Sequence, residues 1–275
     1  MTFAEDRVTR PDGTVHIAVV DSETTSLDPG TAEVIGLGVL CVRVDRARGQ
    51  MLSVVGSAFG WQEPKSCPPA AEAVTGLSAS RLVGCRLDRR KIEALLSQAD
   101  LVVAHHAAFE RPFLEPLFPQ LAELRWACAL YDIDWRTGQK MSHPSINGLL
   151  NAYRLGPSDK TPEGDCRALV KILSQPLLIS PETGFRRLIS ASAQVTIECA
   201  IPDADTEAER HLRALGFRQK RDRWDVQCED AVHALALEMR VIDLAVGPPA
   251  FERLRMWRVD AVGRFRAAVE TSLPS

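Results

Sequence analysis

Residues 15–25 read Val15-His16-Ile17-Ala18-Val19-Val20-Asp21-Ser22-Glu23-Thr24-Thr25, a β-branched run that ends in two acids. Such runs are typical of strands. In a strand, the side chains of Asp21 and Glu23 project from the same side, about 7 Å apart along the chain. Two carboxylates in this position repel each other unless a divalent cation lies between them, and hard oxygen ligands suit Mg²⁺ or Mn²⁺. The alternative is a solvated strand end with turn and cap hydrogen bonds.

The sequence on either side of this stretch predicts an α/β fold. Further strands are expected at Gly36–Val44 and Leu52–Phe59, which form a meander with the first. Leu101–Ala104 is wholly apolar, as in a strand that is buried on both faces of a sheet. A last strand is expected at Arg125–Leu130, and helices at Arg89–Gln98, Arg111–Leu117, Ile146–Tyr153 and Gly164–Leu173. Strands that then alternate with helices indicate a mixed sheet flanked by helices.

A second, smaller module is expected at the end of the chain. The two prolines within Gln175–Pro181 predict a boundary between a domain at 1–178 and an α+β accessory module at 179–275. The module's expected elements are strands at Val195–Ala200 and Arg223–Cys228 and helices at Thr206–Leu215, Glu229–Leu244 and Ala250–Glu270. Its cations and tryptophans suit phosphate contacts and base stacking, or else a solvated face over core anchors. They are Arg218, Lys220, Arg221, Arg223, Trp224, Arg255, Trp257 and Arg258.

Composition excludes several classes of protein. The 275 residues are 45% hydrophobic and 25% charged, a globular mixture rather than a disordered one. The net charge of −3 provides no overall basic field for a polyanion. The seven cysteines are scattered without a C-x-x-C pair, which argues against a zinc ribbon and favours a reducing cytoplasm. No apolar run reaches the roughly 20 residues of a membrane helix, so no membrane contact is expected.

Two further acids stand at predicted helix starts. Glu110 follows the buried strand and a histidine pair in the segment 104–110, at a helix N-terminus that favours a carboxylate. Asp165 lies on the first turn of the helix predicted at Gly164–Leu173. Each acid by itself is also explained as an ordinary first-turn or cap residue.

The order and spacing of these segments resemble the DEDD 3′–5′ exonuclease family, and in particular the proofreading epsilon subunit of bacterial DNA polymerase III. The family's D-x-E-T-T-G motif is similar to Asp21–Ser26, and its A-H-N-A-x-F-D-x-x-F-L motif to Ala104–Leu114. The Pro-x-x-x-x-x-T-G-I element is similar to Pro69–Leu77, and the third motif, H-x-A-x-x-D, is matched at Asp165. The resemblance covers about residues 14–175. It implies a ribonuclease-H-like fold with a five-stranded mixed sheet flanked by helices.

The resemblance also implies a site and a reaction. Asp21, Glu23, Glu110 and Asp165 would hold two Mg²⁺ or Mn²⁺ ions. The ions would support hydrolysis at the 3′ end of DNA or RNA, and the nucleic acid is expected to be single-stranded. Residues expected to contact the terminal nucleotide are Thr24, Thr25, Ser26 and His106. A polymerase or another protein is a possible partner.

Four positions depart from the family pattern. Ser26 replaces Gly and His106 replaces Asn, both beside the expected site. Glu110 replaces Asp, and its extra methylene displaces the carboxylate by roughly 1.5 Å, where catalytic geometry tolerates about 0.5 Å. Lys160 occupies the position of the general-base His, and a protonated lysine cannot accept a proton from water. Three hypotheses follow: a metal-dependent 3′–5′ exonuclease, a catalytically decayed relative that binds nucleic acid or a protein partner, or an unrelated function such as that of a small-molecule enzyme.

Overall fold

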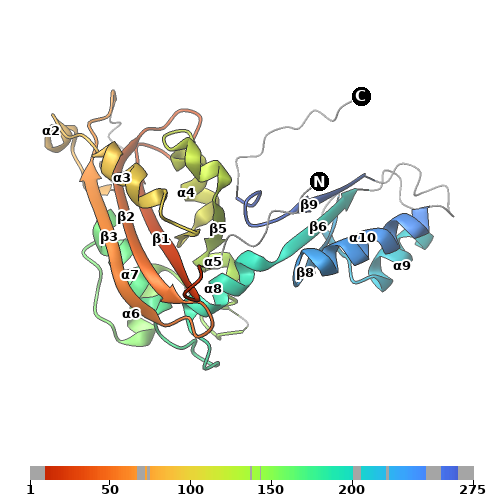
Figure 1. Ribbon diagram of the computed structural model, residues 1–275. Coiled ribbons are helices and arrows are strands. Elements are labelled where there is room, and N and C mark those ends of the chain that lie inside the picture. Colours follow the sequence, from red (N-terminus) through yellow and green to blue (C-terminus); the bar gives the residue numbers. More distant parts are fainter. Residues whose placement is uncertain are drawn as a thin grey trace. The chain divides into compact units, whose positions relative to one another are not determined.

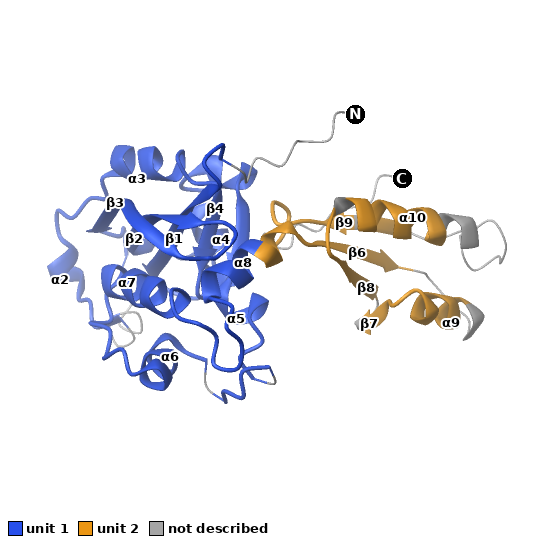
Figure 2. Cartoon of the chain, turned by 60° about the horizontal axis from the view of Figure 1, so that its bottom comes forward, with its two compact units in different colours: residues 1–189, 265–275 blue, residues 190–264 orange. Residues whose placement is uncertain are grey.

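The computed structural model describes residues 10–66, 72, 75–136, 138–142, 144–200, 206–220, 223–245 and 255–265. The chain divides into two compact units, one made of residues 1–189 with 265–275 and the other of residues 190–264 (Figure 2). The division lies within helix α8 (Gly184–Ala193), whereas the sequence placed a boundary between residues 178 and 179. Most of the expected Pro69–Leu77 element lies outside the described residues.

The first unit is built on a five-stranded sheet with the order β3-β2-β1-β4-β5. Strands β1 (Thr14–Thr24), β2 (Val34–Asp45) and β3 (Met51–Trp61) form the antiparallel meander that the sequence predicts. Strands β4 (Leu101–Ala104) and β5 (Arg125–Cys128) continue the sheet parallel to β1. The mixed five-stranded sheet expected from the sequence is therefore confirmed.

Helices cover both faces of this sheet, which explains why β4 and the Ile17–Val20 part of β1 are apolar. One core includes Val19 of β1 with residues of α6, α7 and α8, and the other includes Val20 with residues of α3 and α4. Figure 2 shows α3 on one side of the sheet and α6 and α7 on the other. The remaining helical bounds are α2 (Ala79–Leu82), α3 (Arg89–Leu96), α4 (Ala107–Leu114), η1 (Pro119–Glu123), α5 (Ala129–Asp132), α6 (Ile146–Tyr153) and α7 (Pro162–Leu173).

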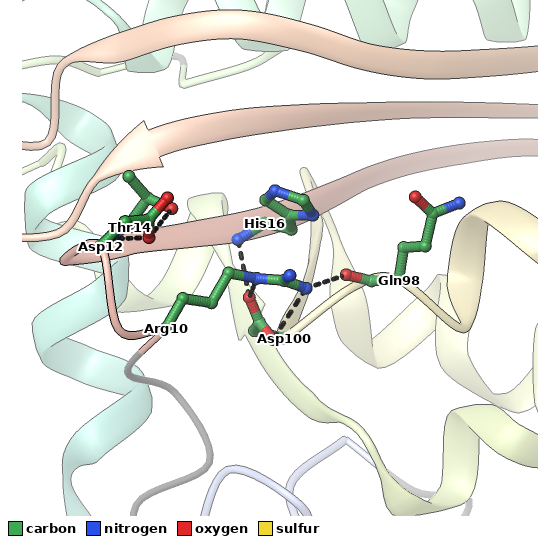
Figure 3. A network of polar contacts seen from close by, with 6 residues as sticks. All are labelled: Arg10, Asp12, Thr14, His16, Gln98 and Asp100. Atoms are coloured by element: carbon green, nitrogen blue, oxygen red, sulfur yellow. Dashed lines mark hydrogen bonds and ion pairs between the residues drawn. The ribbon is translucent and has the colours of Figure 1, made fainter.

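A polar network ties the start of β1 to the start of β4 (Figure 3). The guanidinium of Arg10 donates to Asp100 over 2.7 Å and to the carbonyl oxygen of Gln98 over 2.7 Å. Asp100 also accepts a hydrogen bond of 2.8 Å from the backbone N–H of His16 in β1. The carboxylate thus joins two parallel strands at the end of the sheet opposite the acidic end of β1.

The second unit is a four-stranded antiparallel sheet with the order β7-β8-β6-β9. Its elements follow one another as β-α-β-β-α-β (Figure 1). They are β6 (Val195–Ala200), α9 (Thr206–Ala214), β7 (Arg218–Lys220), β8 (Arg223–Cys228), α10 (Ala231–Ala245) and β9 (Arg255–Val259).

Two expectations for this unit are corrected or decided by the structure. The helix expected at Ala250–Glu270 is wrong where the chain is described, because Arg255–Val259 is a strand paired with β6. Trp224 is only 3% exposed and packs in the core between sheet and helices, with the Arg213 guanidinium 4.8 Å from its ring. Trp224 is therefore a core anchor and not a stacking platform. Arg221 lies outside the described residues.

Two general features complete the description. Among the described residues, no helix has the length and apolar character needed to cross a membrane. The six cysteines of the described part are free thiols, and five of them are buried. They behave as small core side chains, as their scattered positions in the sequence indicate.

Candidate active site

The first two acids lie at the end of β1, opposite two glycines of β2. Asp21 is the cross-strand partner of Gly38, and Glu23 is the partner of Gly36. The register shifts between Glu23 and Thr24, an irregularity of the kind that often re-aims side chains beside active sites. Because Asp21 and Glu23 are two residues apart in one strand, they face the same side of the sheet.

The two glycines allow helix α7 to approach these acids closely. A Cβ atom on Gly38 would lie 2.4 Å from the carbonyl oxygen of Pro162 and 3.0 Å from Sγ of Cys166. A Cβ on Gly36 would lie 2.4 Å from the ring of Trp61. Side chains of normal size would push α7 away from β2, so the Gly-Leu-Gly sequence of β2 sets the position of the helix. Sequence reasoning assigned these glycines no role, although glycine inside a strand is a known sign of close approach.

Asp165 comes from the first turn of α7, where a short loop folds over the helix start. Thr161 is the N-cap and accepts a 3.0 Å hydrogen bond from the N–H of Gly164. Oδ1 of Asp159 accepts a 2.7 Å bond from the Thr161 hydroxyl. A Cβ on Gly164 would lie 1.7 Å from that same oxygen, so the Asp159 side chain would have to move to admit one. The hydroxyl of Ser158 then donates to Oδ1 of Asp165 over 2.5 Å and holds this acid in place.

Glu110 approaches from α4, which packs on the other face of the sheet. Its side chain is 5% exposed. The hydroxyl of Ser22, which lies between Asp21 and Glu23 in β1, donates a 2.6 Å hydrogen bond to Oε2 of Glu110. The Glu110 side chain therefore reaches from α4 to the Ser22 hydroxyl in β1. Ser22 and Ser158 were not singled out by sequence reasoning, because serine at these places carries no pattern of its own.

The electrostatics show that the four acids form one cluster. Burial raises the pKa of Asp21 well above its usual range, and the negative charges of Glu110, Asp165 and Glu23 raise it further. Burial and the charge of Asp165 raise the pKa of Glu23 to about 7. Asp21 is therefore influenced by acids that come from β1, α4 and α7.

The other two acids respond to the same surroundings. Burial raises the pKa of Glu110 to about 8, the hydrogen bond from Ser22 opposes the rise, and the charge of Glu23 adds to it. Burial also raises the pKa of Asp165, against the hydrogen bond from Ser158 and the positive charge of Lys160. In both cases one serine stabilises the ionised form of one carboxyl group.

The cluster fits divalent cations in donor type and in charge. It offers four carboxyl groups whose ionised forms are disfavoured by burial and mutual repulsion, and a hard cation would relieve both. With the side chains as they stand, no group of three or more His, Cys, Asp or Glu residues in the described part of the chain has the arrangement to hold a metal ion. Coordination of an ion by these four acids would need their side chains to move.

The expected substrate-contacting residues of the first motif shape the turn after β1. Thr24 donates its hydroxyl to the carbonyl oxygen of Ser26 over 2.7 Å. The hydroxyl of Thr25 accepts a 2.9 Å bond from the N–H of Glu33, so both threonines hold this turn in place. Ser26 itself is exposed at its tip.

His106 lies at the start of α4, and Lys160 lies directly before the start of α7. His106 is the N-cap residue of α4, with Nε2 3.2 Å from the Tyr131 hydroxyl and its ring stacked on Phe109 at 6.2 Å between centroids. Burial lowers the pKa of His106. Lys160 is exposed and adopts a left-handed backbone with φ of 55°. Its backbone N–H donates to the hydroxyl oxygen of Ser158 over 3.3 Å. Its charge reaches Asp165, so an ammonium group stands at the edge of the cluster.

Comparisons with known proteins gave structural similarities only, since neither family models nor curated proteins matched the chain. One solved structure is exonuclease X in complex with 5′ overhanging duplex DNA, with 17% identity and a TM-score of 0.42, covering 62% of this chain and 99% of that one. A full-length 3′-exonuclease has 12% identity and a TM-score of 0.43, covering 61% and 62%. Cell-death related nuclease 4 has 14% identity and a TM-score of 0.44, covering 61% and 66%.

Proposed function

We propose that this chain is a divalent-metal-dependent nuclease that removes nucleotides from the 3′ ends of nucleic acid. The observation that supports the proposal is the mutual electrostatic effect of Asp21, Glu23, Glu110 and Asp165, which come from three separate elements. A buried group of like charges is costly to a fold unless it serves a purpose such as cation binding.

The four carboxylates would hold two Mg²⁺ or Mn²⁺ ions. When bound, ions of this kind supply an activated water and stabilise the charge on the departing 3′ oxygen. Other residues of the chain would position the acids and the substrate. Ser22 and Ser158 hold Glu110 and Asp165 by hydrogen bonds of 2.6 and 2.5 Å. Ser26 and His106 would contact the terminal nucleotide.

A second function is favoured by one observation, the ammonium group of Lys160 beside Asp165. A protonated lysine provides no proton acceptor, and the loss of a general base typically costs 10²–10⁴-fold in rate. The same side chain could instead contact a phosphate. The second candidate is therefore a protein that binds nucleic acid, or a protein partner, on a nuclease fold that has lost most of its catalysis.

One assay separates the two functions. The full chain is incubated with a 5′-labelled single-stranded oligonucleotide and Mn²⁺, beside an Asp21→Asn variant. Asp12→Asn is the matched control, because Asp12 lies at the other end of β1, where it accepts hydrogen bonds from Thr14. Stepwise shortening from the 3′ end that disappears only in Asp21→Asn supports the nuclease. Binding without shortening supports the second candidate, and the absence of both overturns the two together. DNA and RNA oligonucleotides are compared in parallel.

A further inference from the structure

Helix α10 of the second unit carries apolar side chains on two opposite faces. The inner set is buried in the core between the helices and the sheet, and it consists of Ala234, Leu237 and Val241. The outer set is exposed to 76%, 40% and 59%, and it consists of Val232, Leu235 and Met239. Each set has the spacing i, i+3, i+7, which places its members on one face of a helix. We call the outer set the α10 stripe.

The other helix of the same unit has a single apolar face. Helix α9 buries Ala208 and Leu212 in the same core as α10. Its outer side is charged, with Arg213 paired to Glu209 at 3.6 Å. This is the usual pattern of a surface helix, in which the polar face meets water. The α10 stripe departs from that pattern, and contiguous exposed apolar side chains mark surfaces that bind a partner.

The charges at the two ends of the α10 stripe are opposite in sign. Glu229 is exposed directly before α10 begins, and Arg240 is exposed directly after Met239. The two charges lie at similar distances along the chain from Leu235, on either side of it. A second α10 that runs antiparallel, with Leu235 at a two-fold axis, would therefore bring Arg240 of each copy to Glu229 of the other. A parallel second copy would place like charges opposite each other.

A membrane surface suits the α10 stripe less well than a second copy of the chain does. Amphipathic helices that bind lipid are rich in Lys and Arg on their polar face. Helix α10 contains one such residue, Arg240, beside the acids Glu238 and Asp243. Its charge therefore gives no attraction to anionic lipid, whereas the opposite charges at its two ends complement those of an antiparallel copy.

We propose that the α10 stripe joins two copies of this chain as an antiparallel helix pair, with Leu235 packed against Leu235 of the partner subunit. Arg240 forms an ion pair with Glu229 of the partner subunit at each end. A single pair of short helices is smaller than the about 1,200–2,000 Å² of a standard interface, so the dimer is weak, with a Kd on the order of 10–100 µM. This inference does not depend on the proposed nuclease function.

Sedimentation equilibrium of the full chain measures the association. Between roughly 1 and 500 µM, we expect the average mass to rise from one copy toward two. Leu235→Lys places two like charges at the two-fold axis and should raise the Kd by at least about 10-fold. Val83→Lys is the matched control, because Val83 is also exposed, at 68%, but belongs to the first unit. Its Kd should equal that of the unmodified chain.

Charge reversals test the antiparallel arrangement. Arg240→Glu brings two acids together at each end of the interface, and Glu229→Arg brings two cations together. Each variant alone should therefore have a Kd raised by roughly 3- to 30-fold. An equimolar mixture of the two variants should recover most of the association, because both ion pairs of the mixed dimer again join opposite charges. Circular dichroism checks that every variant is folded, and Met239→Lys provides a second substitution in the stripe.

Three results would overturn the proposal. The first is an unmodified chain that stays monomeric up to the highest concentration. The second is a pair of folded variants, Leu235→Lys and Met239→Lys, that associate as strongly as the unmodified chain. The third is a mixture of the two charge variants that associates no better than either one alone. A monomeric chain whose melting temperature falls in Leu235→Lys would also overturn it, since a segment of the same chain would then cover the stripe.

Discussion

The hydroxyl of Ser22 donates a hydrogen bond of 2.6 Å to Oε2 of Glu110, across 88 residues of sequence and between two elements that pack face to face. The pair joins the acidic end of β1 to the start of α4. It gives the carboxylate of Glu110 a fixed partner in β1. Ser158 does the same for Asp165 over 2.5 Å, so a serine orients each acid that comes from a helix.

Replacement of Ser22 by Ala should weaken metal binding without unfolding the protein. The hydroxyl stabilises the ionised form of Glu110, so its loss makes that carboxylate harder to ionise and to orient. The loss of a hydrogen-bonding partner of a metal ligand typically reduces metal affinity by roughly 10- to 100-fold. Calorimetric titration with Mn²⁺ measures the change, and Ser97→Ala, which removes an exposed hydroxyl bonded to Ala94, is the control. An affinity equal to that of the unmodified protein would contradict the role of Ser22.

Replacement of Gly38 by Ala should damage both stability and the site. The new methyl group would lie 2.4 Å from the backbone oxygen of Pro162, and backbone cannot move aside as a side-chain end can. Overpacking of this kind typically costs about 1–3 kcal/mol, and α7 would carry Asp165 away from Asp21.

Gly60→Ala is the matched control for this substitution. In β3, its methyl group would lie 3.3 Å from only the flexible end of Leu87, so little change is expected. Thermal unfolding and Mn²⁺ titration are compared in both variants. Equal melting temperatures for the two would show that α7 does not need the glycine.

The sheet was predictable because its central strands contain continuous apolar runs in the sequence. Leu101–Ala104 is buried at all four residues, as its composition indicates. The start of α4 was placed too late, because the histidine pair and Ala107 carry no helix signal of their own. The segment Arg255–Val259 was misjudged as helix because its strand character comes from pairing with β6, which local spacing does not encode.

The acids of the site were predictable only through the order of their motifs, since each acid alone has an ordinary structural explanation. In the structure, the negative charges of Glu110, Asp165 and Glu23 all raise the pKa of Asp21, and the site that the four acids would form stays a prediction. The residues that orient these acids and admit α7 close to β2 were not predictable. Ser22, Ser158 and Gly38 act through contacts that only the folded chain creates. Their residue types are common on any surface, and no spacing rule marks them.

The metal-free protein should lose stability as the pH rises from about 4.5 to about 8. Glu110 has its pKa raised to about 8 and Glu23 to about 7, so the folded state binds protons more tightly than the unfolded state. Stability from such groups is fully present below the pKa of the unfolded chain and is lost as the pH passes the folded pKa. The loss is on the order of 1–3 kcal/mol, which lowers the melting temperature by roughly 2–4 °C per kcal/mol.

Melting temperatures at pH 5.5 and pH 8.5, in EDTA and in Mn²⁺, measure this effect. Glu110→Gln removes the titrating group and should reduce the difference between the two pH values. Mn²⁺ should raise the melting temperature more at pH 8.5 than at pH 5.5, because metal and protons compete for the same oxygens. A Glu110→Gln variant with the same pH dependence as the unmodified protein would refute the assignment to this carboxyl group.

Replacement of Lys160 by His should raise the rate of 3′ shortening, by up to about 10²–10⁴-fold if a missing base limits the reaction. The backbone at Lys160 has φ of 55°, and His is among the residues that tolerate this left-handed region best. The loop that carries it is fixed by Ser158 and by the cap of α7, so an imidazole would stand where the ammonium now acts on Asp165. Lys160→Ala separates the gain of a base from the loss of a positive charge. A rate in Lys160→His no higher than in Lys160→Ala would mean that proton acceptance at this position does not limit the reaction.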